Sequence, residues 1–190
     1  MSDQALRHKL IKLAQQKPEL RADLLPLLNR TSSLSPGRHP NGGGWVEDTA
    51  TVADTVFVGL DARVFDKAQV DGSAVITDKA RVFGNVQIDG NAKIGGNAQV
   101  WGNSKIFGRA RISGNARVYD KAHVGGAAYV SGSAIISGNA LVSGTAKISS
   151  KAIVSVNAQI GGDAVILGGY WDGSEGIITS GRWRAPRIPA

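Results

Sequence analysis

The chain contains no cysteine, and histidine and aromatic residues are scarce. Without cysteine there is no disulfide framework and no thiolate metal site. Only 3 of the 190 residues are histidine, and only 6% are aromatic. No apolar run approaches the ~20 residues of a membrane-spanning helix, and residues 1–29 lack the apolar core of a signal peptide. We therefore expect a protein that stays in the cytoplasm, or in a particle assembled there.

What the chain has in abundance is one six-residue period. A valine or isoleucine recurs at every sixth position from Val52 to Ile166, twenty times without a slip. Two residues before it stands an alanine in seventeen of the twenty units, with Val56, Val86 and Ser104 as the exceptions. A fixed short period of this kind indicates a solenoid. Because the period is unbroken, it leaves no room for an inserted loop that could carry catalytic residues.

Each unit has the composition of a short strand followed by a turn. In the segment from Ser113 to Val118, the β-branched valine suits a buried strand position and its polar neighbours suit a solvated face. The Gly-Asn pair of this segment tolerates a positive φ and turns the chain. The alanine stands where the chain turns a corner and where a larger side chain would collide with its neighbours.

This pattern resembles the hexapeptide repeat of left-handed parallel β-helices. Within that family it is most similar to the Gly-Asn-Ala-x-Val arrays of YdcK-like or polymer-forming proteins, many of them phage-encoded. The resemblance covers residues 47–169 and implies an all-β triangular solenoid in which three hexads (3 × 6 = 18 residues) form one coil. Twenty hexads then give six to seven coils, and the prism is about 30 Å long at ~4.8 Å per coil.

The rest of the chain divides into three segments. Residues 1–30 are expected to form a helical arm, and residues 6–28 resemble a short N-terminal peptide of large-phage proteins. Residues 31–46, rich in Gly, Pro and Ser, are predicted to be a flexible linker. Residues 170–190 are predicted to cap the open end of the prism. The apolar stripe by which the arm would dock consists of Leu6, Leu10, Leu13, Leu24, Leu25 and Leu28.

One face of the solenoid is predicted to be an interaction face. Residues that are three hexads apart share a face, and on this face four aromatic residues stand beside an arginine-rich column. The rings either stack and stiffen the prism, at ~0.5–1.5 kcal/mol for each pair, or form a strip for docking. We favour docking. The face consists of Arg63, Phe65, Arg81, Phe83, Trp101, Arg117 and Tyr119.

Catalysis is not expected. Many hexapeptide-repeat proteins are acyltransferases that use a histidine, usually near an inserted loop, as general base. Here His8 falls in the arm, His39 in the linker and His123 at an ordinary outward position. One histidine in the solenoid cannot supply the three ligands of the repeat-family carbonic anhydrases. We expect no catalytic residue, no metal and no cofactor; the alternatives are an acyltransferase relative using His123 and a carbohydrate-binding solenoid.

Charge and resemblance together give the expected function. Residues 1–46 carry seven Lys/Arg and three Asp/Glu (net +4), and residues 47–169 carry twelve and ten (net +2). The cations of the arm alternate with leucine, as on any solvated helix face, so we expect no nucleic-acid partner. We expect a rigid, non-enzymatic structural module of a larger assembly, with other protein subunits or a trimer of itself as partners and no membrane. The resemblance implies a phage particle, or otherwise the bacterial cytoplasm.

Overall fold

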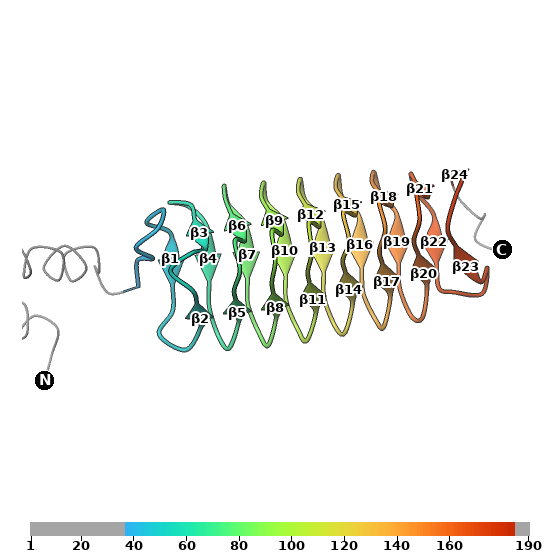
Figure 1. The fold of residues 1–190 in the computed structure, drawn as a ribbon. Coiled ribbons are helices and arrows are strands. Elements are labelled where there is room, and N and C mark those ends of the chain that lie inside the picture. Colours follow the sequence, from blue (N-terminus) through green and yellow to red (C-terminus); the bar gives the residue numbers. More distant parts are fainter. Residues whose placement is uncertain (1–36, 185–190) are drawn as a thin grey trace, which may run out of the picture.

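The fold is a three-sided prism built from 24 short parallel strands. The computed structural model describes residues 37–184, and within this range there is no helix. Successive strands lie on sheets A, B and C in turn, so every third strand returns to the same sheet and each sheet holds eight strands. Figure 1 shows the coils following one another along a single axis, with the two ends of the described chain at opposite ends of the prism.

The strands are two residues long and are assigned to the three sheets as follows. Sheet A holds β1 (Trp45–Val46), β4 (Arg63–Val64), β7 (Arg81–Val82), β10 (Gln99–Val100), β13 (Arg117–Val118), β16 (Ile135–Ile136), β19 (Ile153–Val154) and β22 (Tyr170–Trp171). Sheet B holds β2 (Thr51–Val52), β5 (Gln69–Val70), β8 (Gln87–Ile88), β11 (Lys105–Ile106), β14 (His123–Val124), β17 (Leu141–Val142), β20 (Gln159–Ile160) and β23 (Ile177–Ile178). Sheet C holds β3 (Phe57–Val58), β6 (Val75–Ile76), β9 (Lys93–Ile94), β12 (Arg111–Ile112), β15 (Tyr129–Val130), β18 (Lys147–Ile148), β21 (Val165–Ile166) and β24 (Arg182–Trp183).

Backbone hydrogen bonds join each coil to the next along the prism axis. Arg111 pairs in register with Tyr129 of the following coil, and its N–H donates to the carbonyl of Ala128 at 2.8 Å. The same pattern recurs on sheet B, where the N–H of Thr51 donates to the carbonyl of Ala68 at 2.9 Å. Because all strand pairs between coils are parallel and in the same register, one repeated ladder of bonds joins each coil to the next.

The interior is filled by one aliphatic residue and one alanine from nearly every hexad. Ile112 and Ala116 are buried, whereas Arg111 and Arg117 are exposed, as the six-residue period predicts. Alternation of inward and outward side chains is the ordinary property of a strand, here applied to two residues at a time. Ser104 takes the place of an alanine, and its buried hydroxyl has no hydrogen-bond partner.

From Asp66 to Gly162, every corner of the prism adopts the left-handed backbone conformation. Most corners carry glycine, and a Cβ on Gly96 would lie only 2.8 Å from the backbone nitrogen of Gly114 in the next coil. Glycine adopts a positive φ without steric cost. The residues other than glycine with positive φ are Asp66, Asp78, Asp120, Ser150 and Val156.

The three aspartates among these corner residues each form a hydrogen bond to the next coil. One Asp78 carboxylate oxygen accepts the N–H of Gly96 at 2.7 Å, and Asp66 and Asp120 do the same for the glycine 18 residues further on, at 3.0 Å. Asparagine side chains form a second set of contacts between coils, with Nδ2 to Oδ1 distances of 3.1 to 3.2 Å. These pairs are Asn85 with Asn103, Asn97 with Asn115, and Asn139 with Asn157.

The expected all-β parallel solenoid is confirmed, but the number of coils is larger than expected. Eight strands in each sheet give about eight coils instead of six to seven. The additional strands are β1, which lies in the segment predicted to be a linker, and β22 to β24, which lie in the segment predicted to be a cap. The helical arm, residues 1–30, lies outside the described residues. Among residues 37–184 there is no helix long and apolar enough to span a membrane.

Residues 37–44 fold over the N-terminal end of the prism. The N–H of Val46 donates to the carbonyl of Gly37 at 2.7 Å, and the N–H of Val58 donates to the carbonyl of Asn41 at 2.9 Å. His39, which we placed in the linker, is instead buried, and its Nδ1 lies 3.3 Å from the Asn41 nitrogen. These contacts cover the edges of β1 and β3, which would otherwise expose unpaired backbone groups.

At the C-terminal end, the coil continues with a looser period. Trp171 occupies the inward position of β22 and is buried, and its ring packs edge-on against that of Trp183, with centroids 5.7 Å apart. The indole N–H of each tryptophan donates to a nearby backbone carbonyl, at 2.8 Å to Gly168 and 2.9 Å to Ser180. Two tryptophans thus close the end of the aliphatic core.

Candidate functional site

The four aromatic residues of the predicted interaction face form one continuous stack. Neighbouring ring centroids lie 4.9 Å apart for Phe65 and Phe83, 5.6 Å for Phe83 and Trp101, and 4.5 Å for Trp101 and Tyr119. The planes of neighbouring rings are tilted by only 2 to 6°. We call this set the aromatic ladder. It follows directly from the coil, which brings every eighteenth residue into the same column.

Stacking limits what the aromatic ladder can bind. All four side chains are half-buried, and the faces of the inner rings are covered by their neighbours. Mostly ring edges therefore remain for a partner. A sugar platform requires an exposed ring face, so this geometry does not favour carbohydrate binding at the ladder. Docking of a protein subunit against the ring edges remains a prediction.

The arginine-rich column lies on sheet A beside the aromatic ladder. Arg63 and Arg81 are in register on neighbouring strands, Gln99 follows, and then Arg117. Toward the C-terminus the column becomes apolar, because Ile135 and the isoleucine of β19 take the outward position. A shallow groove of about 330 Å³ lies here, lined by Asn115, Arg117, Ser133, Ile135, Lys151 and Ile153.

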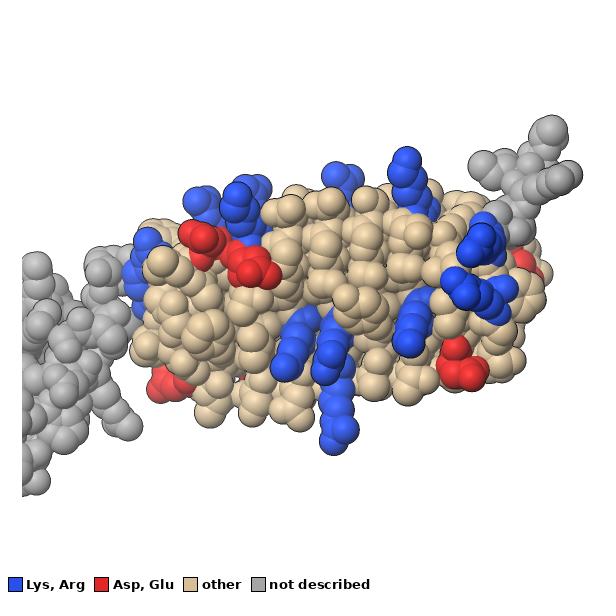
Figure 2. All heavy atoms as spheres, turned by 90° about the horizontal axis from the view of Figure 1, so that it is seen from above, with Lys and Arg blue, Asp and Glu red and all other residues tan. Residues whose placement is uncertain are grey.

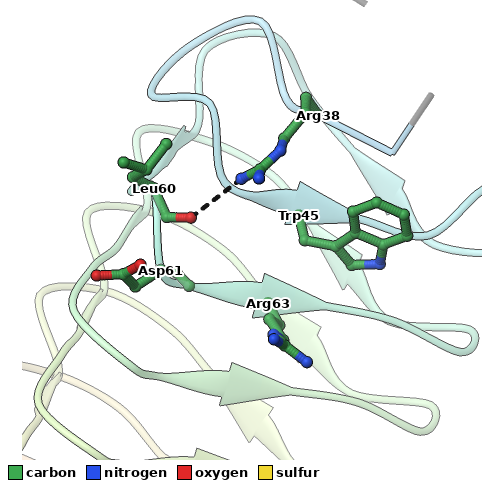
Figure 3. Close-up of a pocket in the computed structure, with 6 residues that line it drawn as sticks. Arg38, Trp45, Leu60, Asp61 and Arg63 are labelled. Atoms are coloured by element: carbon green, nitrogen blue, oxygen red, sulfur yellow. Dashed lines mark hydrogen bonds between the residues drawn. The ribbon is translucent and has the colours of Figure 1, made fainter. Parts of the chain in front are cut away.

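A second hollow lies where residues 37–44 meet sheet A. It measures about 400 Å³, and its lining includes Arg38, Trp45, Leu60 and Arg63. Figure 3 shows the Arg38 side chain reaching toward the carbonyl oxygen of Leu60, which accepts a hydrogen bond from its guanidinium at 3.2 Å. Arg38 also donates to the carbonyl of Gly43 at 2.8 Å. Because these bonds hold the guanidinium against backbone, the hollow is chiefly a structural junction.

Two histidines, His39 and His123, lie in the described part of the chain, and they are in different segments. His123 lies on β14 between Lys105 and Leu141 in register, and no described side chain bonds to its ring. A general base needs a nucleophile or substrate proton within reach and usually a group that orients it. Within residues 37–184, no group of three His, Asp or Glu lies close enough to hold a metal ion. His8 lies outside the described residues, as do the leucines of the docking arm.

Two exposed aromatic residues in the middle of the prism were not predicted to belong to a site. Phe107 is 43% exposed and Tyr129 is 39% exposed, and neither belongs to the aromatic ladder. The Phe107 ring lies over Gly125 of the next coil, where an added Cβ would overlap the ring. The Tyr129 hydroxyl accepts a hydrogen bond from Ser113 at 3.1 Å. The signal available in the sequence was the presence of a glycine 18 residues after Phe107.

Charge is distributed unevenly along the prism, which a sum over the whole solenoid conceals. Residues 47–89 carry four Lys/Arg and eight Asp/Glu, a net charge of 4 − 8 = −4. Residues 90–162 carry eight Lys/Arg and one Asp/Glu, a net charge of 8 − 1 = +7. No first residue of any of the 24 strands is acidic. On the face shown in Figure 2, Lys and Arg project along the length of the prism, whereas Asp and Glu lie toward its two ends.

Comparison with known proteins identifies the repeat and no function. Residues 110–126 match the family described as YdcK Beta solenoid repeat. The matched segment contains β12, β13 and β14. No curated protein and no solved structure matches the chain.

Proposed function

We propose that this protein is a non-enzymatic structural module, a rigid rod that occupies a fixed place in a larger assembly such as a phage particle. The observation that carries the proposal is the unbroken series of coils from β1 to β24. Enzymes need side chains that converge on one point, usually from loops held by a scaffold. Here successive strands are joined by short corners, and the described chain departs from them only in residues 37–44 and in small adjustments after β21.

The rod is stiffened by contacts between coils that repeat at the same position. Backbone ladders, asparagine pairs and the aromatic ladder all join a residue to its counterpart in the next coil. An interior of aliphatic side chains and alanine packs densely and leaves little freedom for bending. Stiffness and constant shape are the properties that an assembly component needs.

Attachment to the assembly is proposed to use the arm and one face. The arm, residues 1–30, would act as a tether through its leucine stripe, because a short amphipathic segment is stable only when its apolar side packs on something. The edges of the aromatic ladder and the apolar groove around Ile135 would provide a second contact on sheet A. Both contacts suit other protein subunits or further copies of this chain.

The experiment that tests this proposal is a native-mass measurement of the full chain and of a variant lacking residues 1–30. The full chain is expected to form a defined oligomer, or to join an assembly when its natural partners are present. The shortened chain is expected to keep its β-rich circular dichroism spectrum and to lose association. A shortened chain that associates as the full chain does would rule out the tether.

Catalysis offers a second check. We expect no acyl transfer from acyl-coenzyme A to amine or hydroxyl acceptors, because His123 has neither an inserted loop nor an orienting group beside it. Turnover that disappears in His123→Ala, but persists in Gln159→Ala two coils further along the same sheet, would establish an enzyme and end the structural proposal.

A further inference from the structure

We propose that sheet C, together with its corner with sheet B, carries a binding site for single-stranded nucleic acid in the middle of the prism. The site combines cationic side chains with two exposed aromatic rings. We call it the basic aromatic patch. It consists of Lys93, Phe107, Arg109, Arg111, Tyr129 and Lys147.

The cations of the patch form a column along the prism axis. Lys93, Arg111, Tyr129 and Lys147 follow one another in register on β9, β12, β15 and β18. At the ~4.8 Å spacing of parallel strands, this column spans roughly 15 Å. Lys93, Arg111 and Lys147 are exposed, and Arg109 adds a further exposed cation at the corner before β12. A row of cations of this length can contact several consecutive phosphates.

The patch has few carboxylates near it, and the nearest along the sequence is Asp89, which stands 18 residues before Phe107 on the preceding coil. Asp120 is the single carboxylate between residues 90 and 162, and it lies at the corner between sheets A and B, away from sheet C. The neighbouring coils on the N-terminal side, residues 47–89, carry the net charge of −4 and would repel a polyanion. Attraction in one section and repulsion in the next would confine an anionic chain to the middle of the rod.

The aromatic rings of the patch differ from those of the aromatic ladder in having no stacked neighbour among the described residues. Phe107 lies over Gly125 and is 43% exposed. Tyr129 is held at its hydroxyl by Ser113 and is exposed on sheet C. An exposed aromatic ring that no other ring stacks on can serve as a platform for a nucleic-acid base.

Single strands fit this arrangement better than a duplex or an acidic protein. In a duplex the bases are already stacked on one another and cannot lie on Phe107 or Tyr129. An acidic protein surface would use the cations, but it would leave the two exposed rings unexplained. The expectation against nucleic acid rested on residues 1–46, and this patch lies on a different part of the molecule.

The test is fluorescence anisotropy of the full-length protein with a labelled single-stranded oligonucleotide of mixed sequence, titrated at several salt concentrations. Binding should weaken as salt rises. Arg111→Glu should weaken binding and reduce the slope of log Kd against log salt by about 0.7 for each phosphate that the variant no longer neutralises. Phe107→Ala should weaken binding roughly five- to hundredfold and leave the salt slope nearly unchanged.

Two further variants sharpen the test. Gly125→Ala should act like Phe107→Ala, because its Cβ occupies the place of the ring; if Gly125→Ala does not fold, Phe107→Ala alone carries this arm. Lys121→Glu is the control for Arg111→Glu, because it makes the same change of charge outside the patch, at the corner between sheets A and B. This variant should bind the oligonucleotide as the unmodified protein does. Melting temperatures confirm that each variant is folded.

Three outcomes would overturn the proposal. The first is no binding of the oligonucleotide even at low salt. The second is loss of binding in Lys121→Glu equal to that in Arg111→Glu, which would mean that only total charge matters. The third is displacement by poly-glutamate as effective as by unlabelled oligonucleotide together with unchanged binding in Phe107→Ala, which would identify an acidic protein as the partner.

Discussion

At the scale of single residues, few interior alanine positions and few corner glycine positions hold another residue type. Two such substitutions are informative because one lies in the interior and the other at a corner. Ser104 stands at an interior position that alanine fills elsewhere, and Val156 stands at a corner where its φ is 55°. Both are predicted to lower the stability of the present chain.

Ser104→Ala is expected to raise the free energy of unfolding by roughly 1 kcal/mol. The buried hydroxyl has no partner, and removing an unsatisfied polar group recovers its desolvation cost. Urea unfolding followed by circular dichroism measures the change. Ala122→Ser, at the same position one coil later, is the matched control and should lower stability by a similar amount. A destabilising effect of Ser104→Ala would mean that the hydroxyl makes a contact important for the corner.

Val156→Gly is expected to raise the melting temperature. A β-branched residue in the left-handed region costs about 1–3 kcal/mol, whereas glycine gives back about 0.5–1 kcal/mol through its unfolded-state entropy. The side chain is 48% exposed, so its removal sacrifices little packing. Val165→Gly, at an outward strand position with an ordinary φ, should instead lower the melting temperature. Equal effects of the two substitutions would contradict the argument from backbone strain.

At the scale of the structural element, the aromatic ladder is the most distinctive feature. Each of its members is the residue that directly follows one of the strands β4, β7, β10 and β13. Each inner ring contacts two others, and each outer ring contacts one. The contribution of a ring should therefore depend on its place in the ladder.

Trp101→Ala is expected to remove about twice as much stacking energy as Phe65→Ala does. Trp101 stacks on both Phe83 and Tyr119, and each stacked pair contributes about 0.5–1.5 kcal/mol beyond burial. Chemical unfolding of the isolated protein measures the free energy of unfolding of both variants. If neither substitution changes stability in isolation, the rings serve docking alone and the stiffening role is wrong.

The strands could be predicted from the sequence wherever the six-residue period is strict, because one β-branched residue marks each inward position. The ends could not be predicted in this way. At the start, Val46 keeps the period but is preceded by Gly42-Gly43-Gly44, a composition typical of linkers. At the end, the residues in inward register are Ile166, Trp171, Ile178 and Trp183, spaced by 5, 7 and 5 residues, so the coil continues while the period fails.

The site was predictable in part, for a related reason. Addition of 18 to a residue number places side chains in columns, and this was enough to bring Phe65, Phe83, Trp101 and Tyr119 together. The residue number alone does not give the direction in which a side chain points. The position of the Phe107 ring over Gly125 and the burial of His39 depend on side-chain torsions and on the path of residues 37–44.

At the scale of the whole molecule, the coil behaves as a one-dimensional lattice in which neighbours contact only neighbours. Deletion of residues 111–128, one full coil, is therefore expected to leave a folded prism with a modestly lower melting temperature. Deletion of residues 111–116, one hexad, should also keep the core but should move Tyr119 off the column of Trp101. Circular dichroism and thermal unfolding test both deletions. A full-coil deletion that fails to fold would show that the coils are not interchangeable.

The direction of the backbone ladders has a mechanical consequence. All bonds between coils lie along the axis that joins the two ends of the prism. Force applied at the two ends therefore loads one coil's bonds at a time, as in opening a zipper, and does not load the whole ladder in shear. Such a rod resists bending and compression, yet under tension it would lengthen in equal steps. Each released coil of 18 residues adds roughly 60 Å of extended chain.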